Sequence, residues 1–420
     1  MKLKNVLFIG ISFLFACQSD NDVSLLEGEM PPLIPRQDIV LTSVEQQLSL
    51  KTNSFAFKLL KTVYENERAH ENILLSPMSA TLALLMLNNG AAGATQDEIQ
   101  QTLGYYNFSR ESINTYAQKI VNAMQSLDSR GKFESANSIW VRTDFQLINS
   151  FKQINQQYYY AEIQNVDFSK PTTLLAINNW VSDKTNKKIT EIMKEIDPLT
   201  LMILINAIYF KGYWTSPFMK EYSIDDIFHA SSGLDQNVPT MRKTSISLPY
   251  AKINNYSVVE LSFGNGAFSL VVVLPDEDTN ISNVITQISG DWWEQITKNL
   301  GKHPFKVNLS IPRFKLEYER TINNDLKALG IKAPFNLESA DFSLASHERL
   351  FVSLLKQKNI ALLDENGMES AAVTIICMDS SPSTIEYTPV DFKVNRPFLY
   401  FIKEKSTGLV FFSGVINKIT

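Results

Sequence analysis

The sequence predicts a mixed α+β fold in a single large domain. Helical patterns come first along the chain and most strand patterns follow, which favours α+β over a doubly wound α/β fold. From about residue 46 to residue 420 no break in composition marks a second linker, although a chain of 420 residues would allow two domains. Apolar residues make up 44% of the chain and charged residues 20%, the mix of a folded protein. The net charge of −5 is mild and gives no support to nucleic-acid binding.

The first 17 residues have the pattern of an export signal. A short basic start precedes an apolar run, residues 6–16, that is too short to cross a bilayer as a helix. The run ends in Leu14-Phe-Ala-Cys17, which resembles the lipobox of bacterial lipoproteins, where the cysteine becomes the lipidated N-terminus. We therefore expect residues 1–17 to be a lipoprotein signal peptide and Cys17 to carry the lipid. An ordinary cleaved signal peptide is the alternative.

Residues 18–45 are polar and irregular and contain three prolines, so we expect a flexible tether between membrane and domain. The acidic stretch at residues 18–22 resembles surface-export signals of some diderm bacteria. Together these features predict a secreted protein, anchored by lipid to a bacterial outer membrane and exposed at its surface. Cys377 would be the one thiol of the mature chain, which leaves no internal disulfide. We expect a monomer.

Helical patterns with recognisable ends occur at four places. Ser76-Pro77 offers an N-cap and a first-turn proline to an apolar run that ends at Asn89-Gly90. Thr95 and Glu98 make a capping box for the next helix, which Gly104 closes. The other two apolar faces at helical spacing are Phe55, Leu59, Leu60 and Val63, and then Ile322, Leu326 and Leu329 before Gly330.

Strand patterns concentrate in the second half of the chain. Residues 268–274 are almost continuously apolar, as in a strand that is covered on both faces. Residues 398–402 and 409–415 flank a Ser-Thr-Gly turn and predict a hairpin. A strand with one buried face is predicted by the alternation of Val307, Leu309 and Ile311 with polar neighbours.

Motifs for catalysis or for metal and cofactor binding do not occur. The chain has no H-E-x-x-H, no C-x-x-C, no G-x-S-x-G, no phosphate-binding loop and no dinucleotide fingerprint. The four histidines are His70, His229, His303 and His347. We expect no enzyme, no catalytic residue, no metal and no cofactor; an enzyme whose triad assembles from scattered residues is the remote alternative.

One segment near the C-terminus does not have the pattern of a regular element. Residues 365–374 begin with small side chains and become β-branched, and residues 375–384 end in a Ser/Thr/Pro-rich run. Long irregular loops in compact domains are usually functional or disordered. From composition alone, an edge strand followed by a surface loop and a functional loop are both open.

Seven motifs, in order over roughly residues 50–420, resemble those of the serpin family. The most specific is the eleven-residue segment Leu204-Ile-Asn-Ala-Ile-Tyr-Phe-Lys-Gly-Tyr-Trp214. The others are Asn72-Ile-Leu-Leu-Ser-Pro-Met-Ser79, Asn89-Gly-Ala-Ala-Gly-Ala-Thr95, Ser135-Ala-Asn-Ser-Ile-Trp140, Asn179-Trp-Val before Thr185 and Ile189, Pro312-Arg-Phe, and Asn395-Arg-Pro-Phe398.

This resemblance implies a single domain, residues 46–420, with helices packed around three β-sheets and an exposed reactive-centre loop at about residues 365–390. It implies a protease inhibitor that acts as a suicide substrate. The protease cleaves the loop and forms an acyl-enzyme, and the loop then inserts as a strand in the central sheet. The expected partner is a serine protease, or a cysteine protease. The alternative is a non-inhibitory member of the family that acts as a binding or carrier protein.

The resemblance also assigns positions. Ser76, Ser79 and Asn206 match the shutter under the central sheet, and Trp214 matches a tryptophan near the top of that sheet. Gln357 stands where many members have the shutter histidine, so a different hydrogen-bond network is expected there. The positions that match the loop hinge are Glu365, Gly367, Met368, Glu369, Ser370, Ala371, Ala372, Val373 and Thr374.

Strand alternation would turn Met368, Ser370, Ala372 and Thr374 into the sheet and leave Glu369 outside. Met368 is the largest of the four, and inhibitors usually have threonine or another small residue at its position. Methionine is flexible and can adapt. The hinge composition favours an inhibitor, whereas Met368 and Gln357 are the case for the non-inhibitory alternative.

Four residues are candidates for the reactive bond. Counting about fourteen residues from the hinge glycine, the spacing of this strand-addition family, gives Ser381, but most proteases do not cut before a proline such as Pro382. Counting back from Pro397 points near Glu386, so the loop is longer than the common form. The candidates are Ser380, Ser381, Ser383 and Thr384, with the bond between Ser380 and Ser381 preferred. Small residues here, and the absence of Arg and Lys between Met368 and Lys393, favour elastase-like or subtilisin-like proteases.

Overall fold

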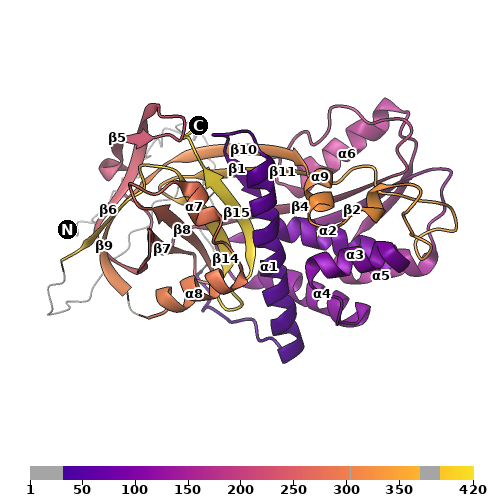
Figure 1. Ribbon diagram of the computed structural model, residues 1–420, viewed down its shortest axis with the longest axis horizontal. Coiled ribbons are helices and arrows are strands. Elements are labelled where there is room, and N and C mark those ends of the chain that lie inside the picture. Colours follow the sequence, from indigo (N-terminus) through magenta and orange to yellow (C-terminus); the bar gives the residue numbers. More distant parts are fainter. Residues whose placement is uncertain (1–31, 303, 369–387) are drawn as a thin grey trace, which may run out of the picture. The chain divides into compact units, whose positions relative to one another are not determined.

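A computed structural model describes residues 32–302, 304–368 and 388–420 (Figure 1). In this part of the chain the helices are α1 (Ser43–Asn66), α2 (Pro77–Gly90), α3 (Gly93–Leu103), α4 (Arg110–Ser126), α5 (Asn149–Tyr159), α6 (Pro171–Lys184), α7 (Ile281–Ile285), α8 (Gly290–Leu300) and α9 (Asn323–Ala328), with short 3₁₀ turns η1 (Lys220–Tyr222) and η2 (Ala333–Phe335). None of these helices is both long and apolar enough to span a bilayer.

The strands follow the α+β order that the sequence predicts, with most of them in the second half of the chain. They are β1 (Ile73–Leu75), β2 (Lys132–Arg142), β3 (Glu162–Val166), β4 (Met202–Tyr213), β5 (Ile224–His229), β6 (Asp235–Ile253), β7 (Tyr256–Phe263), β8 (Phe268–Pro275), β9 (Pro304–Pro312), β10 (Phe314–Thr321), β11 (Lys356–Leu363), β12 (Gly367–Met368), β13 (Val390–Lys393), β14 (Phe398–Glu404) and β15 (Val410–Ile416).

The described strands form two hydrogen-bonded sheets. A six-stranded sheet has the order β10-β11-β12-β4-β2-β3, and a nine-stranded sheet has the order β1-β15-β14-β8-β7-β6-β9-β13, with β5 also on β6. The long strand β6 pairs with β9 and β5 along one part and with β7 along another, and its pairing with β9 shifts between Lys243 and Ile246. The nine-stranded sheet is therefore two sheets that share β6, which gives the three sheets expected from the sequence.

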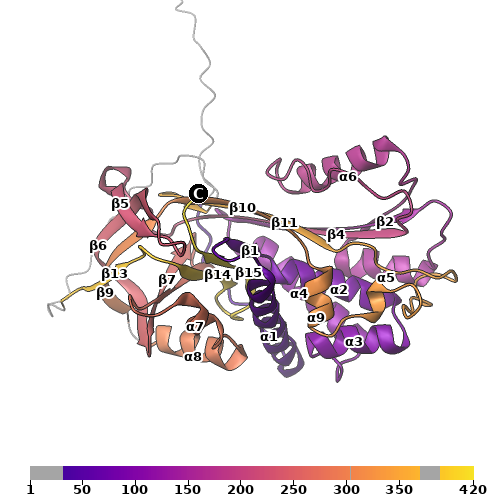
Figure 2. The same ribbon diagram turned by 45° about the horizontal axis from the view of Figure 1, so that its top comes forward.

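Helices cover both faces of the six-stranded sheet. Figure 2 shows α6 on one face and α2, α4 and α5 on the other. Strand β4 is buried on both sides because alternate side chains enter two cores. Ile203, Ile205 and Ala207 join the core under α6, whereas Leu204 and Phe210 join the main core with α2 and β15. This double burial explains the continuous apolar run in the segment's sequence.

Most of the local predictions are confirmed. Ser76 caps α2, with its hydroxyl accepting from the Ser79 amide, and Gly104 ends α3 with a φ of 75°. Strand β8 is buried at every position, and β14 and β15 pair antiparallel around the predicted turn.

The capping box at Thr95 and Glu98 is wrong. Helix α3 begins at Gly93, so both residues lie inside its first two turns. The Thr95 hydroxyl instead accepts from the amide of Asp341, at 2.8 Å. The Glu98 carboxylate accepts from the amides of Lys332 and Ala333. These amides belong to distant loops and have no backbone acceptor among the described residues, so they donate to the side-chain oxygens of Thr95 and Glu98 instead. An amide left without a partner would be costly.

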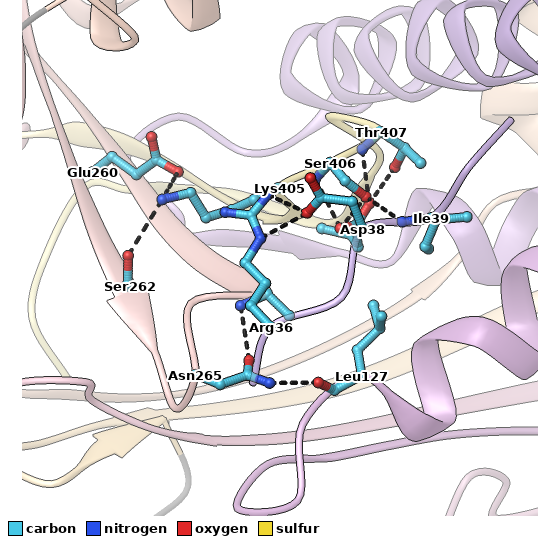
Figure 3. Close-up of polar contacts among 12 residues, drawn as sticks. Arg36, Asp38, Ile39, Leu127, Glu260, Ser262, Asn265, Lys405, Ser406 and Thr407 are labelled. Atoms are coloured by element: carbon cyan, nitrogen blue, oxygen red, sulfur yellow. Dashed lines mark hydrogen bonds and ion pairs between the residues drawn. The ribbon is translucent and has the colours of Figure 1, made fainter. Parts of the chain in front are cut away.

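The last part of the expected tether, residues 32–42, differs from a free chain. Ser129 donates to the carbonyl of Pro32, and the side-chain amide of Asn265 donates to the carbonyl of Ile34. The amide of Ile39 donates to the hydroxyl of Ser406, in the turn between β14 and β15 (Figure 3). Ile39 and Leu41 also pack against the core, so the body of the protein includes this segment.

Arg320 of β10 joins three elements near one end of the six-stranded sheet. Its guanidinium binds the carboxylates of Asp325 in α9, at 2.7 Å, and of Glu67 after α1, at 2.8 Å. The Asp325 side chain is only 1% exposed. In the ladder Arg320 lies opposite Gln357, so this ion-pair network stiffens the strand that carries a predicted site residue.

We expect Arg320→Ala to lower the free energy of unfolding by about 3–5 kcal/mol, because the buried carboxylate of Asp325 loses its charged partner. Urea denaturation followed by circular dichroism measures the change. Arg36→Ala is the control: it removes an exposed ion pair with Asp38 and should cost less than about 1 kcal/mol. Equal losses in the two variants would contradict this account of the network.

Candidate functional site

The six-stranded sheet is split between β4 and β11. Strand β12 lies between them at one end, where Met368 is opposite Leu363 of β11 and Gly212 of β4. At the other end a single parallel bridge joins Ile203 to Leu354. Within the described residues no ladder joins β4 to β11 between these two points. Among the described strands the sheet therefore contains a slot, and β12 lies at its head.

A cavity of about 200 Å³ lies along the slot. Met368 forms part of its wall and is 4% exposed, so its side chain belongs to the core of the protein. Besides Met368, the apolar side chains that line the cavity include Ile208, Phe210, Ala361, Ile402 and Phe412. Charged residues line it as well, namely Lys187, Lys188, Lys315 and Glu317.

Gly367, the predicted hinge glycine, approaches β4 more closely than any other residue type allows. A Cβ atom at this position would lie 2.0 Å from the carbonyl oxygen of Gly212 and 2.8 Å from the Cα atom of Tyr213. Both obstacles are backbone atoms, which cannot rotate away. The entry of the chain into the slot therefore requires glycine.

Trp214 holds the turn that leads into the slot. Its indole donates to the carbonyl of Asp364, at 2.9 Å, and its amide donates to the carbonyl of Asn366, at 2.8 Å. The indole ring stacks on Phe263 with ring centroids 4.6 Å apart. The structure thus places Trp214 at the head of the slot, as its motif predicts.

Glu365 lies in the same turn and is held on two sides. Its carbonyl accepts from the amide of Phe218, at 2.8 Å. Its carboxylate, with the side chain 8% exposed, lies 3.5 Å from the guanidinium of Arg313. The other carboxylate oxygen is buried without a hydrogen-bond partner among the described residues. Sequence reasoning missed Arg313 as a partner, although its Pro-Arg-Phe motif was recognised.

The predicted shutter residues meet under the slot, around the first turn of α2. The side-chain amide of Gln357 in β11 donates to the carbonyl of Ser76, at 2.8 Å, and the Ser76 amide donates back to Gln357, at 3.3 Å. The Ser76 hydroxyl donates to the carbonyl of Phe411. The Ser79 hydroxyl donates to the carbonyl of Asn206 in β4, at 3.2 Å. One helix turn therefore contacts both strands that border the slot.

Two asparagines extend this network and were missed from sequence. Asn359 donates to the carbonyl of Leu74 and lies two residues from Gln357, on the same face of β11. Asn137 of β2 accepts from the side-chain amide of Asn206, at 2.6 Å. For Asn359 the available signal was the alternation of uncharged polar residues with lysines from Lys356 to Asn359, which turns Gln357 and Asn359 to the inner face of β11. Buried polar groups need partners there.

Strand β13 anchors the chain where it returns to the body. It pairs parallel with β9, from Val390 to Lys393. The ammonium of Lys393 lies 3.1 Å from Asp226 of β5, which also binds Arg242. Partial burial opposes ionisation of Asp226, but the hydrogen bonds from Lys393 and the Ile227 amide, with the charges of Lys393 and Arg242, together lower the pKa of this carboxyl. The anchor is therefore an ion pair at neutral pH.

The structure places the two flanks of the expected loop but not the loop itself. Met368 ends β12, and β13 begins at Val390. Among the described side chains no group of three His, Cys, Asp or Glu is arranged to hold a metal ion. The site residues that lie outside the described part of the chain are Cys17, Glu369, Ser370, Ala371, Ala372, Val373, Thr374, Ser380, Ser381, Ser383 and Thr384.

Comparison with known proteins gives the same family at three levels. The family model described as "Serpin (serine protease inhibitor)" matches residues 50–419. The chain is 31% identical to Iripin-2 of Ixodes ricinus, over 89% of this chain and 94% of the relative. It is 30% identical to the leukocyte elastase inhibitor of Homo sapiens, over 88% of this chain and 98% of the relative.

Among solved structures, the thermophilic serpin tengpin in its native state is 32% identical and superimposes with a TM-score of 0.81. The similarity covers 92% of this chain and 98% of tengpin. A split central sheet, a hinge glycine at its head and a family match over nearly the whole described domain agree: the chain belongs to the serpin family.

Proposed function

We propose that this chain inhibits a protease by acting as a suicide substrate. The observation that carries the proposal is the slot between β4 and β11 with β12 seated at its head. Strand β12 is antiparallel to both neighbours, so the residues that follow it can continue the same strand without a change of direction. Most family members are inhibitors of proteases and not enzymes themselves.

Continued pairing gives a free-energy gain for insertion after the loop is cut. Along the slot no described strand other than β12 pairs with the facing edges of β4 and β11, and each ladder hydrogen bond that an inserting strand forms there contributes about 0.5–1.5 kcal/mol. Apolar side chains that face the main core gain further by burial. Cleavage frees the loop to move, and a protease that is still bound as an acyl-enzyme moves with it.

The register of β12 also predicts where the hinge residues would stop. Met368 is opposite Gly212 and Leu363. Six residues further along the same register, Thr374 would lie between Asn206 and Gln357. It would then sit over the first turn of α2, where its hydroxyl meets the polar network of the shutter. A small polar side chain suits that position, whereas a charge there would be buried.

The target we propose is a serine protease, or a cysteine protease, with a preference for small side chains. No Arg or Lys occurs between Met368 and Lys393. A trypsin-like enzyme therefore finds no basic residue in this segment after which it could cleave. The similarity to a protein named leukocyte elastase inhibitor is consistent with an elastase-like target. We further propose that a monomer acts on one protease molecule and needs no cofactor.

Incubation with a panel of elastase-, subtilisin-, trypsin- and papain-like proteases tests the proposal. We expect SDS-stable complexes with elastase-like or subtilisin-like enzymes and none with trypsin-like ones, because an acyl-enzyme trapped by insertion survives denaturation. Mass spectrometry of the released peptide identifies the bond. Cleavage by every protease without a stable complex would favour a non-inhibitory carrier or binding protein.

Thr374→Arg should turn the inhibitor into a substrate. The charge would be buried between Asn206 and Gln357 during insertion, which costs several kcal/mol if it stays unpaired. The measured quantity is the fraction of cleaved protein that ends in complex, and it should fall at least tenfold. Val373→Arg is the matched control, because strand alternation leaves that side chain outside. Equal complex yields in the two variants would argue against insertion in this register.

We also propose that a lipid on Cys17 anchors the protein to a bacterial outer membrane. Cys17→Ser should then release the protein from membrane fractions and leave complex formation unchanged, because anchoring comes from the buried acyl chains. Fractionation with detection by immunoblot measures the release. Membrane association that persists in the variant would show that this cysteine is not the anchor.

A further inference from the structure

We propose that Met368 seats the hinge in the slot of the intact protein and sets the register in which the loop inserts. The seat is a property of the uncleaved chain, whereas its effect on inhibition rests on the function proposed above. Met368 is larger than the side chains expected at this position, and the proposal gives this larger side chain a specific role in loop insertion.

The seat is formed by the side chain of Met368 together with its backbone. The side chain is 4% exposed and lies in the main core. It forms one wall of the cavity with Phe210, Ile208 and Phe412. The backbone pairs with Gly212 on one side and Leu363 on the other. A flexible thioether side chain fills an irregular apolar space of this kind well.

The preceding turn, residues 364–367, is stabilised by its own hydrogen bonds and does not depend on the burial of Met368. The Asp364 carboxylate accepts from the amides of Asn366, at 2.8 Å, and Gly367, at 3.3 Å. Trp214 binds the same turn through two hydrogen bonds. Gly367 belongs to this turn and also pairs with Tyr213 of β4. Met368 is the first residue whose side chain enters the core between β4 and β11, and its burial is the contact that draws the chain in.

A seated Met368 also fixes which face of the inserting strand is buried. A shift of one residue would exchange the two faces of the strand. Glu369 would then face the core side of the cavity, beside Phe210 and Phe412, and Met368 would face out. The shifted register therefore loses apolar burial and buries a carboxylate. With threonine at this position, the two registers would differ less in free energy, because less apolar surface would be buried in the correct one. The large side chain therefore fixes the register. Insertion begins with Met368 already paired with Gly212 and Leu363.

Seating has a consequence for the length of the loop. With Met368 held, the segment that a protease can reach includes at most the residues between Met368 and Val390, where β13 begins. A seat at the hinge shortens the accessible loop. The loop of this chain is longer than the common form by its sequence count, which offsets the residues that the seat withdraws.

Hydrogen exchange of the intact protein, without any protease, tests the seat. Met368→Thr should raise the exchange rate of amides at the head of the slot, in residues 210–214 and 360–364, by about tenfold or more, because the buried contact is lost. Met368→Leu is the matched control and should exchange like the unsubstituted protein. Unchanged exchange at helix α1 shows that both variants are folded. Exchange at the head that is equal in all three proteins would overturn the proposal.

A second readout uses an elastase-like protease. Met368→Thr should increase the number of inhibitor molecules cleaved per complex by at least about threefold, since insertion that starts unseated competes less well with deacylation; Met368→Leu should not. If Met368→Thr changes hydrogen exchange but leaves the number of inhibitor molecules cleaved per complex unchanged, the role of Met368 in insertion is overturned. If even the unsubstituted protein forms no complex, the proposed inhibition fails, while the exchange data still decide whether Met368 is seated.

Discussion

The first turn of α2 holds both edges of the split sheet, and the rest of the site depends on this contact. Ser76 exchanges two hydrogen bonds with Gln357 of β11, and Ser79 binds the carbonyl of Asn206 in β4. The same Ser76 caps the helix. A change in the separation of β4 and β11 must therefore break or rearrange bonds at the start of a helix that is buried along its whole length. Gln357 is suited to this place because its amide both donates and accepts, and the contact does not require a titrating group.

Above this contact the slot has no ladder of its own among the described strands, and its stability comes from its two ends. At the head, Gly367 lies against the backbone of β4 and Met368 enters the core. At the foot, Ile203 and Leu354 form one bridge. The backbone groups between these points are the part of the sheet that a further strand would satisfy. A protein with such a sheet can gain hydrogen bonds and apolar burial by taking up its own loop, which is the physical source of the proposed inhibition.

Polar groups buried near the head give the turn its single arrangement. Glu365 lies beside Arg313 at 3.5 Å, and Trp214 binds the backbone of the turn through two donors. An ion pair at this distance adds little to stability, yet a buried carboxylate without it would be costly. The pair therefore acts mainly through specificity: it disfavours other positions of the turn. The chain then leaves the turn at Gly367 in the one direction that leads Met368 into the slot.

The sequence by itself determined the features that depend on neighbours along the chain. The serine cap of α2, the glycine that ends α3, the fully buried β8 and the hairpin of β14 and β15 follow from local patterns, and the ordered motifs identified the family. Only the tertiary structure decided the features that depend on distant partners. Thr95 and Glu98 have the spacing of a capping box, but loop amides more than 230 residues away take their oxygens. Met368 looked too large for the hinge, and only the packing of two sheets shows the apolar space that receives it.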